Sequence, residues 1–210
     1  MNILVTAGPT WVKIDEIRVI TNIFTGRSGL FIAEEFKKRG YEVTLVINPH
    51  CIEKLPSQIE VIPFQYFDEL ARKIKNELRR KRYDIIIHSA AVSDYKPIRK
   101  FNYKISSKRK QLILKLVPTE KIIKTIRERA KSSFLVQFKL EITRKKLLEK
   151  AYRSLKENGS DLVVANAWED LKSGYRAFIV DKVKQVKEVS SLKSLVEGIE
   201  SLFYAKRKEG

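Results

Sequence analysis

The stretch FIAEEFKKRGYEVTLVI, residues 31–47, decides the fold class of this chain. Its first half places apolar side chains at helical spacing as far as Gly40, a favourable residue at a helix end. Its second half, residues 41–47, is rich in β-branched side chains and stops before an Asn-Pro pair, as a buried strand does. Because residues 3–6 form another strand-like run before it, the sequence predicts a β-α-β unit.

The same alternation continues along the rest of the chain, which is typical of a parallel sheet with helices on both faces. We therefore predict a doubly wound, mostly parallel α/β sheet of Rossmann type with a terminal antiparallel hairpin. No internal repeat or low-complexity linker interrupts the pattern, so residues 1–210 are expected to form a single domain. The other predicted strands lie near residue 61 and at residues 84–88, 111–116, 134–138, 161–166, 177–180 and 185–189, and the other predicted helices at residues 68–80, 119–131, 143–158 and 192–203.

Residues 95–111 form the one long stretch without periodicity. From Tyr95 to Lys110 there are one proline, two serines and seven basic residues. This composition cannot bury much apolar surface, and we predict a flexible flap here.

The charge of the chain is strongly positive and unevenly distributed. There are 43 Lys and Arg residues against 25 Asp and Glu, which gives a formal net charge of +18. Residues 96–150 alone contain 18 basic and 4 acidic side chains. Such an imbalance indicates a polyanionic partner, although runs of like charge are also the usual composition of solvated helix faces.

Composition also excludes several classes of protein. A hydrophobic fraction of 43% supports a packed core and argues against general disorder. Cys51 is the single cysteine, so an internal disulfide and any multi-cysteine metal site are excluded. No run approaches the roughly 20 apolar residues of a membrane span, and the N-terminus lacks the pattern of a signal peptide. We expect a soluble, cytoplasmic protein that does not bind membranes.

The candidate site residues follow the predicted strands, because ligands of open parallel sheets bind at the carboxyl ends of the strands. The segments AGPT (residues 7–10) and TGRSG (residues 25–29) combine glycines with a helix start, a phosphate-binding arrangement. Neither GxGxxG nor GxxxxGK[ST] is present, so a standard dinucleotide fingerprint or P-loop is not expected. After the strand at 84–88, an Ala-Ala pair allows a flat ring to lie against the backbone, and Asp94 can bind ribose hydroxyls or a cation. An ordinary strand-to-loop turn is the alternative.

Seven blocks in order resemble phosphopantothenoylcysteine synthetase, also called phosphopantothenate–cysteine ligase. They are VTAGPT (5–10), IDEIRVITN (14–22), TGRSG (25–29), AAVSDY (90–95), KISS (104–107), FKLE (138–141) and DLVVAN (161–166). The resemblance implies a ligase of coenzyme A biosynthesis that joins 4′-phosphopantothenate to cysteine. The acid would first react with CTP or ATP to give an acyl-nucleotidylate and pyrophosphate, and the cysteine amine would then displace the nucleotide. Mg²⁺ would normally accompany the triphosphate.

The resemblance also assigns roles to individual residues. Asn22 would hold the acyl intermediate, and Lys104 on the flap would reach the triphosphate, so both are predicted to be catalytic. The predicted acid-substrate residues are Arg18, Asn22, Ala90 and Ala91, and Asp94 is the candidate metal ligand. The predicted nucleotide-binding residues are Gly8, Ala90, Ala91, Asp94, Lys104, Glu120, Lys121, Ile122, Phe138, Arg153 and Lys156.

Several positions depart from the pattern of the bifunctional bacterial enzymes. Val12 replaces an acidic residue and Glu16 a proline, while residues 119–122 read TEKI where those enzymes have N-P-D-I. The KISS and FKLE blocks are more similar to stand-alone synthetases, which differ among themselves in using CTP or ATP. The base preference therefore stays open. Because the synthetase's first strand begins at Met1, no flavin-binding decarboxylase half is expected, and the resemblance implies a homodimer.

Two other functions fit parts of the sequence. A Rossmann-type NAD(P)-dependent oxidoreductase would need a Gly-rich fingerprint and a Tyr-x-x-x-Lys pair, of which only Tyr152 and Lys156 are present, without a preceding catalytic serine. A nucleic-acid-binding module would use the basic segment 96–150, but no basic strand interleaved with aromatics supports it. Nucleic acid is therefore not the expected partner.

Overall fold

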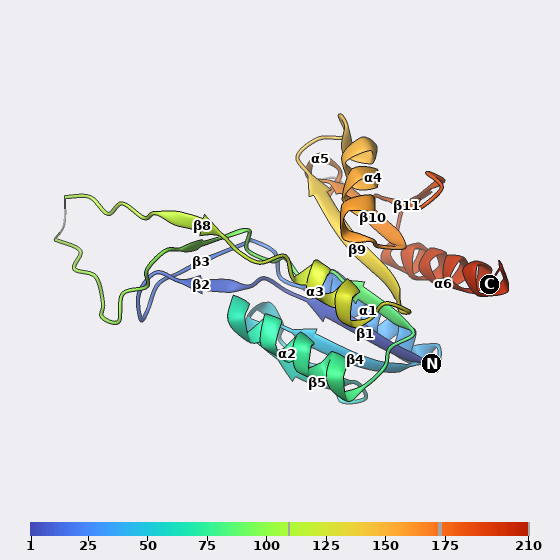
Figure 1. Cartoon of the computed structure of the whole chain (residues 1–210), viewed down its shortest axis with the longest axis horizontal. Coiled ribbons are helices and arrows are strands. Elements are labelled where there is room, and N and C mark those ends of the chain that lie inside the picture. Colours follow the sequence, from blue (N-terminus) through green and yellow to red (C-terminus); the bar gives the residue numbers. More distant parts are fainter. Residues whose placement is uncertain (109, 172–173, 210) are drawn as a thin grey trace.

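An eight-stranded sheet forms the centre of the computed structural model, which describes residues 1–108, 110–171 and 174–209 (Figure 1). The strand order is β12-β11-β10-β9-β6-β1-β4-β5. The strands from β10 to β5 are parallel, and β11 and β12 continue the sheet as an antiparallel hairpin. The sheet consists of β1 (Asn2–Ala7), β4 (Glu42–Ile47), β5 (Glu60–Pro63), β6 (Ile85–His88), β9 (Phe134–Glu141), β10 (Leu162–Ala167), β11 (Ala177–Asp181) and β12 (Val186–Val189).

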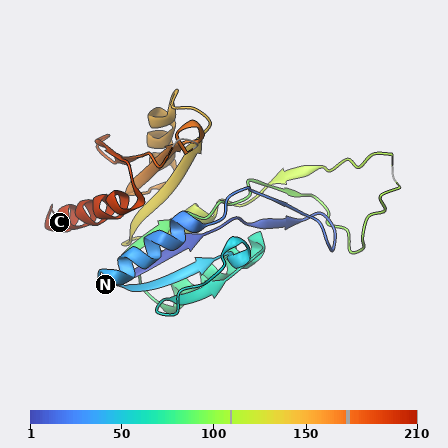
Figure 2. The ribbon, with the colours of Figure 1, turned by 180° about the vertical axis from the view of Figure 1, so that it is seen from behind.

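Helices cover both faces of this sheet. The helix α1 packs on β1 and β4 and lies beside α6 on one face, where Ile32 and Phe36 join the core (Figure 2). The pair α2 and α3 covers the opposite face, and α4 packs there on β9, β10 and β11. The helices are α1 (Arg27–Lys38), α2 (Phe67–Arg80), α3 (Ile122–Arg129), α4 (Leu147–Asn158), the short α5 (Trp168–Leu171), α6 (Leu192–Glu209) and the 3₁₀ turn η1 (Pro49–Cys51).

The predicted doubly wound sheet and its terminal hairpin are confirmed, but several element ends differ from prediction. The strand β9 continues three residues beyond 138, and α6 runs past 203 to Glu209. The helix α4 begins at Leu147 instead of residue 143. The Thr119 hydroxyl donates to the carbonyl oxygen of Ser93 at 2.7 Å, so it does not cap α3, which begins only at Ile122.

The strand predicted over residues 111–116 is wrong except for its last residue. The strand β8 (Leu116–Pro118) pairs with β7 (Tyr95–Pro97), and residues 111–115 have no regular structure. Alternation alone does not make a strand, because extended backbone also needs a partner for its N–H and C=O groups.

Two narrow ribbons project together from the sheet (Figure 1). The first, β2 (Trp11–Lys13) with β3 (Val19–Thr21), follows the carboxyl end of β1, and the second, β7 with β8, follows β6. We call residues 11–21, 95–108 and 110–118 the arm. The first ribbon was missed, because three-residue strands give too short a pattern. The predicted flap forms the far part of the arm, and its flexibility stays a prediction.

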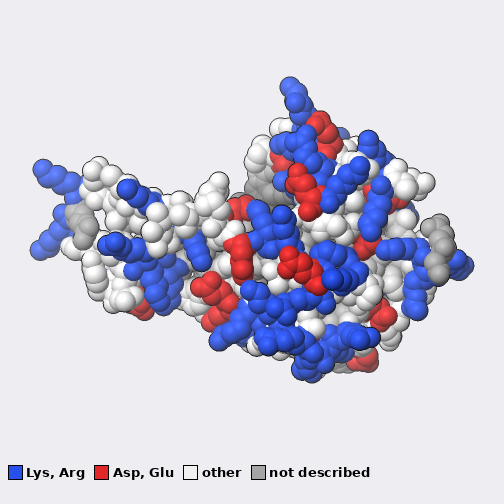
Figure 3. Space-filling model, in the orientation of Figure 1, with Lys and Arg blue, Asp and Glu red and all other residues white. Residues whose placement is uncertain are grey.

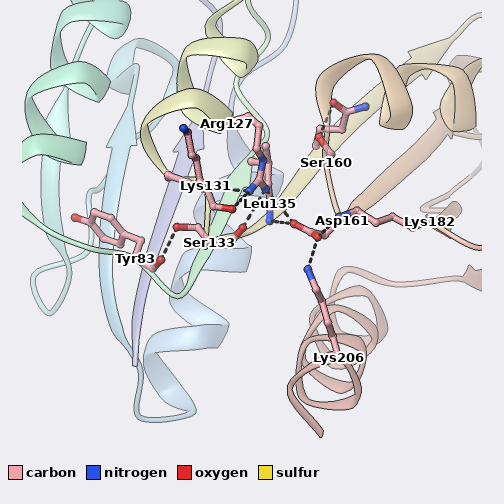
Figure 4. A network of polar contacts seen from close by, with 11 residues as sticks. Tyr83, Arg127, Lys131, Ser133, Leu135, Ser160, Asp161, Lys182 and Lys206 are labelled. Carbon is pink, nitrogen blue, oxygen red and sulfur yellow. Dashed lines mark hydrogen bonds and ion pairs between the residues drawn. The ribbon is translucent and has the colours of Figure 1, made fainter. Parts of the chain in front are cut away.

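A buried carboxylate joins several elements at the amino edge of the sheet (Figure 4). Asp161, which directly precedes β10, accepts a hydrogen bond from the backbone N–H of Leu135 at 2.8 Å. It also forms ion pairs with Arg127 of α3 at 3.0 Å, Lys182 at 2.7 Å and Lys206 of α6 at 2.5 Å. Burial disfavours its ionised form, but the hydrogen bonds from Lys182 and Lys206 outweigh it and lower the pKa of Asp161. This network ties the helices of both faces to the sheet.

Candidate functional site at the strand-order reversal

The candidate site lies where the strand order reverses beside β1. The chain extends the sheet from β1 through β4 to β5, and then returns to place β6 on the other side of β1. The loops after β1 and β6 stay paired, with the N–H of Thr10 donating to the Ala91 carbonyl at 3.1 Å, but the helices that follow them, α1 and α3, lie on opposite faces of the sheet. Such a reversal is the usual ligand site of open α/β sheets. These loops are residues 7–10 and 89–94, two of the segments singled out in the sequence.

Close packing explains the glycines of this site. Gly26 has a φ of +85°, and a Cβ there would lie 2.7 Å from the backbone nitrogen of Gly8. A Cβ on Gly29 would lie 2.6 Å from the Cβ of Ala7 and 2.5 Å from the Oγ of Ser89. The start of α1 is thus pressed against the ends of β1 and β6, so that its first backbone N–H groups face this site. Such N–H groups at a helix start favour anions.

Asn22 is held at the site by a contact across the chain. It follows β3, and its side-chain Nδ2 donates a 3.0 Å hydrogen bond to the carbonyl oxygen of Ala91. The same loop is fixed to the start of the first ribbon, because the Ser93 backbone N–H donates to the Thr10 hydroxyl at 2.8 Å. The structure therefore brings Asn22 and the Ala-Ala pair together from distant parts of the sequence.

Two adjoining cavities share one wall at this edge. The smaller, of about 400 Å³, lies over the start of α1, and the larger, of about 800 Å³, lies between α3 and α4. The shared wall consists of Ala90, Val92, Asp94, Phe138 and Lys139. Other predicted site residues line one cavity each. The smaller cavity is lined by Gly8, Asn22 and Ala91, and the larger by Glu120, Lys121, Ile122 and Arg153.

Charged side chains surround the larger cavity. Lys121 donates to Asp94 at 2.6 Å, and both side chains are exposed. Glu141 accepts from Lys150 at 2.6 Å and pairs with Lys139 at 3.2 Å. The hydrogen bond from Lys150 is the main cause that lowers the pKa of Glu141. These lysines belong to the basic segment 96–150. Other basic residues of that segment lie on the arm, on α3 and in the turn before α4, and basic side chains are spread widely over the face in Figure 3.

Three predicted residues do not reach the cavities. Arg18 and Lys104 lie on the arm, and Arg18 donates to Asp15 at 2.8 Å and to the Ile105 carbonyl at 3.1 Å. Four residues of extended chain, roughly 13 Å, separate Arg18 from Asn22. The Nζ of Lys156 lies over the ring of Tyr152, 4.8 Å from its centroid, on a part of α4 that lines neither cavity.

Four uncharged or neutral polar residues of the larger cavity were not predicted from the sequence. His88 ends β6, Gln137 lies opposite it on β9, and both line this cavity. From α4, Ser154 and Asn158 line it where Arg153 and Lys156 were predicted. Helical spacing indicates this arrangement. Residues 150, 154 and 158 are four apart and lie on one face of the helix, whereas residue 156 lies on another face.

A magnesium ion fits the larger cavity only if a bound ligand supplies some of the oxygen atoms that coordinate it. Within the described residues, no group of three or more His, Cys, Asp and Glu side chains is arranged to hold a metal ion. Mg²⁺ at triphosphate sites usually takes one or two carboxylates together with phosphate oxygens. Asp94 and Glu120 both line the larger cavity, so the donor set fits that mode of binding.

Strand order and cavities define a doubly wound α/β protein with its candidate ligand site at the switch point. The chain belongs to the family described as the DNA/pantothenate metabolism flavoprotein C-terminal domain, which matches residues 1–194.

Individual relatives agree with this assignment. The chain is 42% identical over 167 residues to the coenzyme A biosynthesis bifunctional protein CoaBC of Thermococcus kodakarensis, a match that covers 78% of this chain and 40% of that protein. The crystal structure of the DNA/pantothenate metabolism flavoprotein from Streptococcus pneumoniae is 30% identical, with a TM-score of 0.87 over 98% of this chain and 99% of that one. A Cab2 mutant in complex with phosphopantothenate-cysteine shares the fold, with 20% identity and a TM-score of 0.83 over 99% of this chain and 88% of that one.

Proposed function

We propose that this chain ligates 4′-phosphopantothenate to L-cysteine, with cleavage of CTP or ATP to the nucleoside monophosphate and pyrophosphate. One observation carries the proposal: residues from blocks far apart in the sequence line two adjoining cavities at the switch point, in a chain of this family. The named activity of the Thermococcus protein, coenzyme A biosynthesis, supports the same reaction, although this chain spans only 40% of that protein's length.

The two cavities suit the two substrates of the first step. The larger, with Lys121, Lys139, Lys150 and Arg153, would take the nucleoside triphosphate, because its cations can balance the phosphates. The smaller, with Asn22 and the start of α1, would take the acid. The carboxylate and the α-phosphorus would then meet at the shared wall beside Ala90, where nucleophilic attack forms the acyl-nucleotidylate and releases pyrophosphate.

Asn22 is suited to the second step. Its amide is neutral and is fixed by Ala91, so it can hold the acyl-nucleotidylate without being acylated itself. The cysteine amine then attacks the carbonyl carbon, the amide bond forms, and the nucleoside monophosphate leaves. Mg²⁺ bound with the triphosphate would be held by Asp94 and Glu120 and would neutralise charge on the phosphates.

A homodimer formed through the arm would complete this site. The arm exposes apolar side chains that a lone chain leaves in water, with exposed fractions of 61% for Ile98 and 73% for Ile113. Arg18 and Lys104 lie on the same arm, away from the cavities of their own chain. We infer that they act on ligands in a complex of two chains, or after the arm has moved. Light scattering of the wild type and of Ile113→Asp tests the dimer, and a monomeric wild type would contradict it.

The alternative functions gain no support from the site. The Tyr152 hydroxyl is directed to the carbonyl oxygen of Lys182, and neither Tyr152 nor Lys156 lines a cavity, as an oxidoreductase pair would. On the face that Figure 3 shows, the basic side chains are interspersed with acidic ones. Within the described residues, no helix is long and apolar enough to cross a membrane.

Pyrophosphate release tests the proposed reaction directly. The purified chain is incubated with Mg²⁺, 4′-phosphopantothenate and either CTP or ATP, with and without cysteine. We expect release that depends on 4′-phosphopantothenate with one of the two nucleotides, and amide product only when cysteine is added. Release with neither nucleotide would contradict the proposal.

A further inference from the structure

His88 is a buried side chain whose hydrogen-bonding capacity is only half used. It ends β6, is 8% exposed and lines the larger cavity. Its Nδ1 lies 2.8 Å from the Oγ1 of Thr6. Across the described part of the chain, its Nε2 has no hydrogen-bond partner. Nε2 is not fully enclosed by the protein, so water or a ligand in the cavity that His88 lines can supply its partner.

The Thr6 hydroxyl can pair with either tautomer of the His88 ring. It accepts from the backbone N–H of Ala90 at 3.4 Å, and it keeps a second lone pair and its own hydrogen for Nδ1 of His88. Burial lowers the pKa of His88 to about 4, and the ring is neutral near pH 7. When the hydroxyl donates to Nδ1, the ring proton lies on Nε2, and His88 then offers an uncharged N–H donor to the cavity.

Three more uncharged side chains lie around His88. Gln137 is its register partner on β9 and donates to the Ser154 hydroxyl at 3.0 Å. Asn158 uses its Nδ2 twice, donating to Oε1 of Gln137 at 3.0 Å and to Ser154 at 3.2 Å. Its Oδ1 accepts no hydrogen bond from the described residues. We call His88, Gln137, Ser154 and Asn158 the polar floor. Among the described residues, neither Nε2 of His88 nor Oδ1 of Asn158 has a hydrogen-bond partner.

Most other polar side chains of this cavity are charged. They are the cations Lys121, Lys124, Lys139, Lys150 and Arg153 and the acids Asp94, Glu120, Glu141 and Glu157. Phosphates bind most strongly to such cations, whereas an uncharged polar surface gains more from an uncharged ligand edge with matched donors and acceptors. A nucleoside triphosphate carries both kinds of group, and a cavity of about 800 Å³ accommodates it.

We propose that the polar floor reads the nucleobase of the triphosphate, with Nε2 of His88 donating to the base and Oδ1 of Asn158 accepting from it. The inference rests on the proposed function for the kind of ligand, and it adds the residues that set the base preference. An amino group beside a ring nitrogen, as on cytosine and adenine, offers a donor and an acceptor to this pair. The cations would hold the phosphates whichever base is attached.

Calorimetric binding without acid or cysteine tests the proposal, because no turnover is needed. The probes are CTP, ATP and inorganic tripolyphosphate, and the protein is the full chain. The double variant Thr6→Val/His88→Phe removes the ring nitrogen together with its hydroxyl partner, and the backbone N–H of Ala90 loses only a long 3.4 Å contact. We expect the affinity for the preferred nucleotide to fall about 10- to 100-fold, as for one lost hydrogen bond of 1–3 kcal/mol. Binding of tripolyphosphate should be unchanged.

A reciprocal variant and a second floor variant complete the test. Lys150→Gln should weaken tripolyphosphate and both nucleotides alike and leave the base preference intact. Asn158→Ala, on a partly exposed helix position, should weaken the preferred nucleotide and not tripolyphosphate, which keeps the test valid if the double variant does not fold.

Two results would overturn the inference. One is an equal loss of tripolyphosphate and nucleotide in the floor variants, and the other is no loss of either. If the wild type and the floor variants all bind nucleotide and ligate normally, only the role of the polar floor is refuted. A wild type that binds neither nucleotide would refute the proposed function as well.

Discussion

The carboxylate of Asp15 accepts a 3.0 Å hydrogen bond from the backbone N–H of Ile105, 90 residues further along the chain. It also accepts from the guanidinium of Arg18 at 2.8 Å. Asp15 is 1% exposed and thus links the first ribbon of the arm to the residue after Lys104. Burial disfavours its ionised form, but backbone N–H groups, that of Ile105 first, outweigh it and lower the pKa of Asp15 to about 2. It is therefore ionised throughout the working range of an enzyme.

Asp15→Asn should loosen the flap and leave the ribbon turn intact. The Oδ1 of Asp15 accepts from the backbone N–H groups of Ile17 and Arg18, and an Asn oxygen can still do so. Its Oδ2, which accepts from Ile105 and the Arg18 guanidinium, would become an amide nitrogen that cannot. We expect faster amide hydrogen exchange at Ile105 and a higher KM for the substrates, with kcat less affected. Ser107→Ala, at an exposed position close to the same anchor, serves as the control and should resemble the wild type.

Asn22→Asp should separate the two steps of the proposed reaction. The carboxylate cannot donate to the Ala91 carbonyl and would repel an acyl-nucleotidylate. We expect pyrophosphate release in the presence of 4′-phosphopantothenate to continue, with little amide product on addition of cysteine. Thr21→Val removes a neighbouring hydrogen bond, from the Thr21 hydroxyl to the Thr10 carbonyl, and should leave both steps intact. Absence of pyrophosphate release from Asn22→Asp would refute the role assigned to Asn22.

Arg153 and Lys156 should differ sharply, although both were predicted to bind the nucleotide. Arg153 lines the larger cavity, and Lys156 lies over Tyr152 outside it. We expect Arg153→Gln to raise the KM for the triphosphate several-fold and Lys156→Gln to leave it unchanged. Steady-state kinetics at saturating acid and cysteine measures both. Equal effects of the two substitutions would contradict the placement of α4 at the cavity.

Gly26→Ala should cost far more stability than Gly40→Ala. The φ values are nearly equal, +85° and +84°, so the strain of a left-handed backbone, about 1 kcal/mol, is common to both. A Cβ at Gly40 meets nothing within 4 Å, whereas at Gly26 it lies 2.7 Å from the backbone of Gly8. We expect an additional loss of about 1–3 kcal/mol in the free energy of unfolding for Gly26→Ala, as for other overpacked sites. Urea unfolding of both variants measures the difference.

Asp161→Asn should remove part of the acid sensitivity of the fold. In the folded protein the pKa of Asp161 is lowered below the ordinary aspartate value of 3.8, so its ionisation stabilises the fold above that pH. This contribution is lost as the pH falls through the lower, folded-state pKa. Near neutral pH we expect the free energy of unfolding of the wild type to be about 2–3 kcal/mol larger than that of the variant. The difference is smaller than for a fully buried ion pair because the lysine partners are half exposed. The gap should narrow below about pH 4. A gap independent of pH between 3 and 7 would contradict the ion-pair origin.

The helices and buried strands could be predicted because each leaves a periodic signal of its own. Residues 31–47 gave α1 and β4 nearly to their ends, and the terminal hairpin followed from two short alternating runs. The first ribbon of the arm could not be predicted, since its strands have three residues each and are held by pairing with one another. Residues 111–115 alternate but lack a partner strand, and so form none.

The sequence by itself determined the layers of this protein, its family and part of the lining of the two cavities, because alternating apolar patterns and ordered motif blocks are local properties. Only the tertiary structure decided which side chains face the site. The pairing of β6 with β9 set Gln137 beside His88, and the rotation of α4 turned Ser154 and Asn158 inward in place of Lys156. These placements depend on the packing of elements far apart in the chain, which no local pattern records.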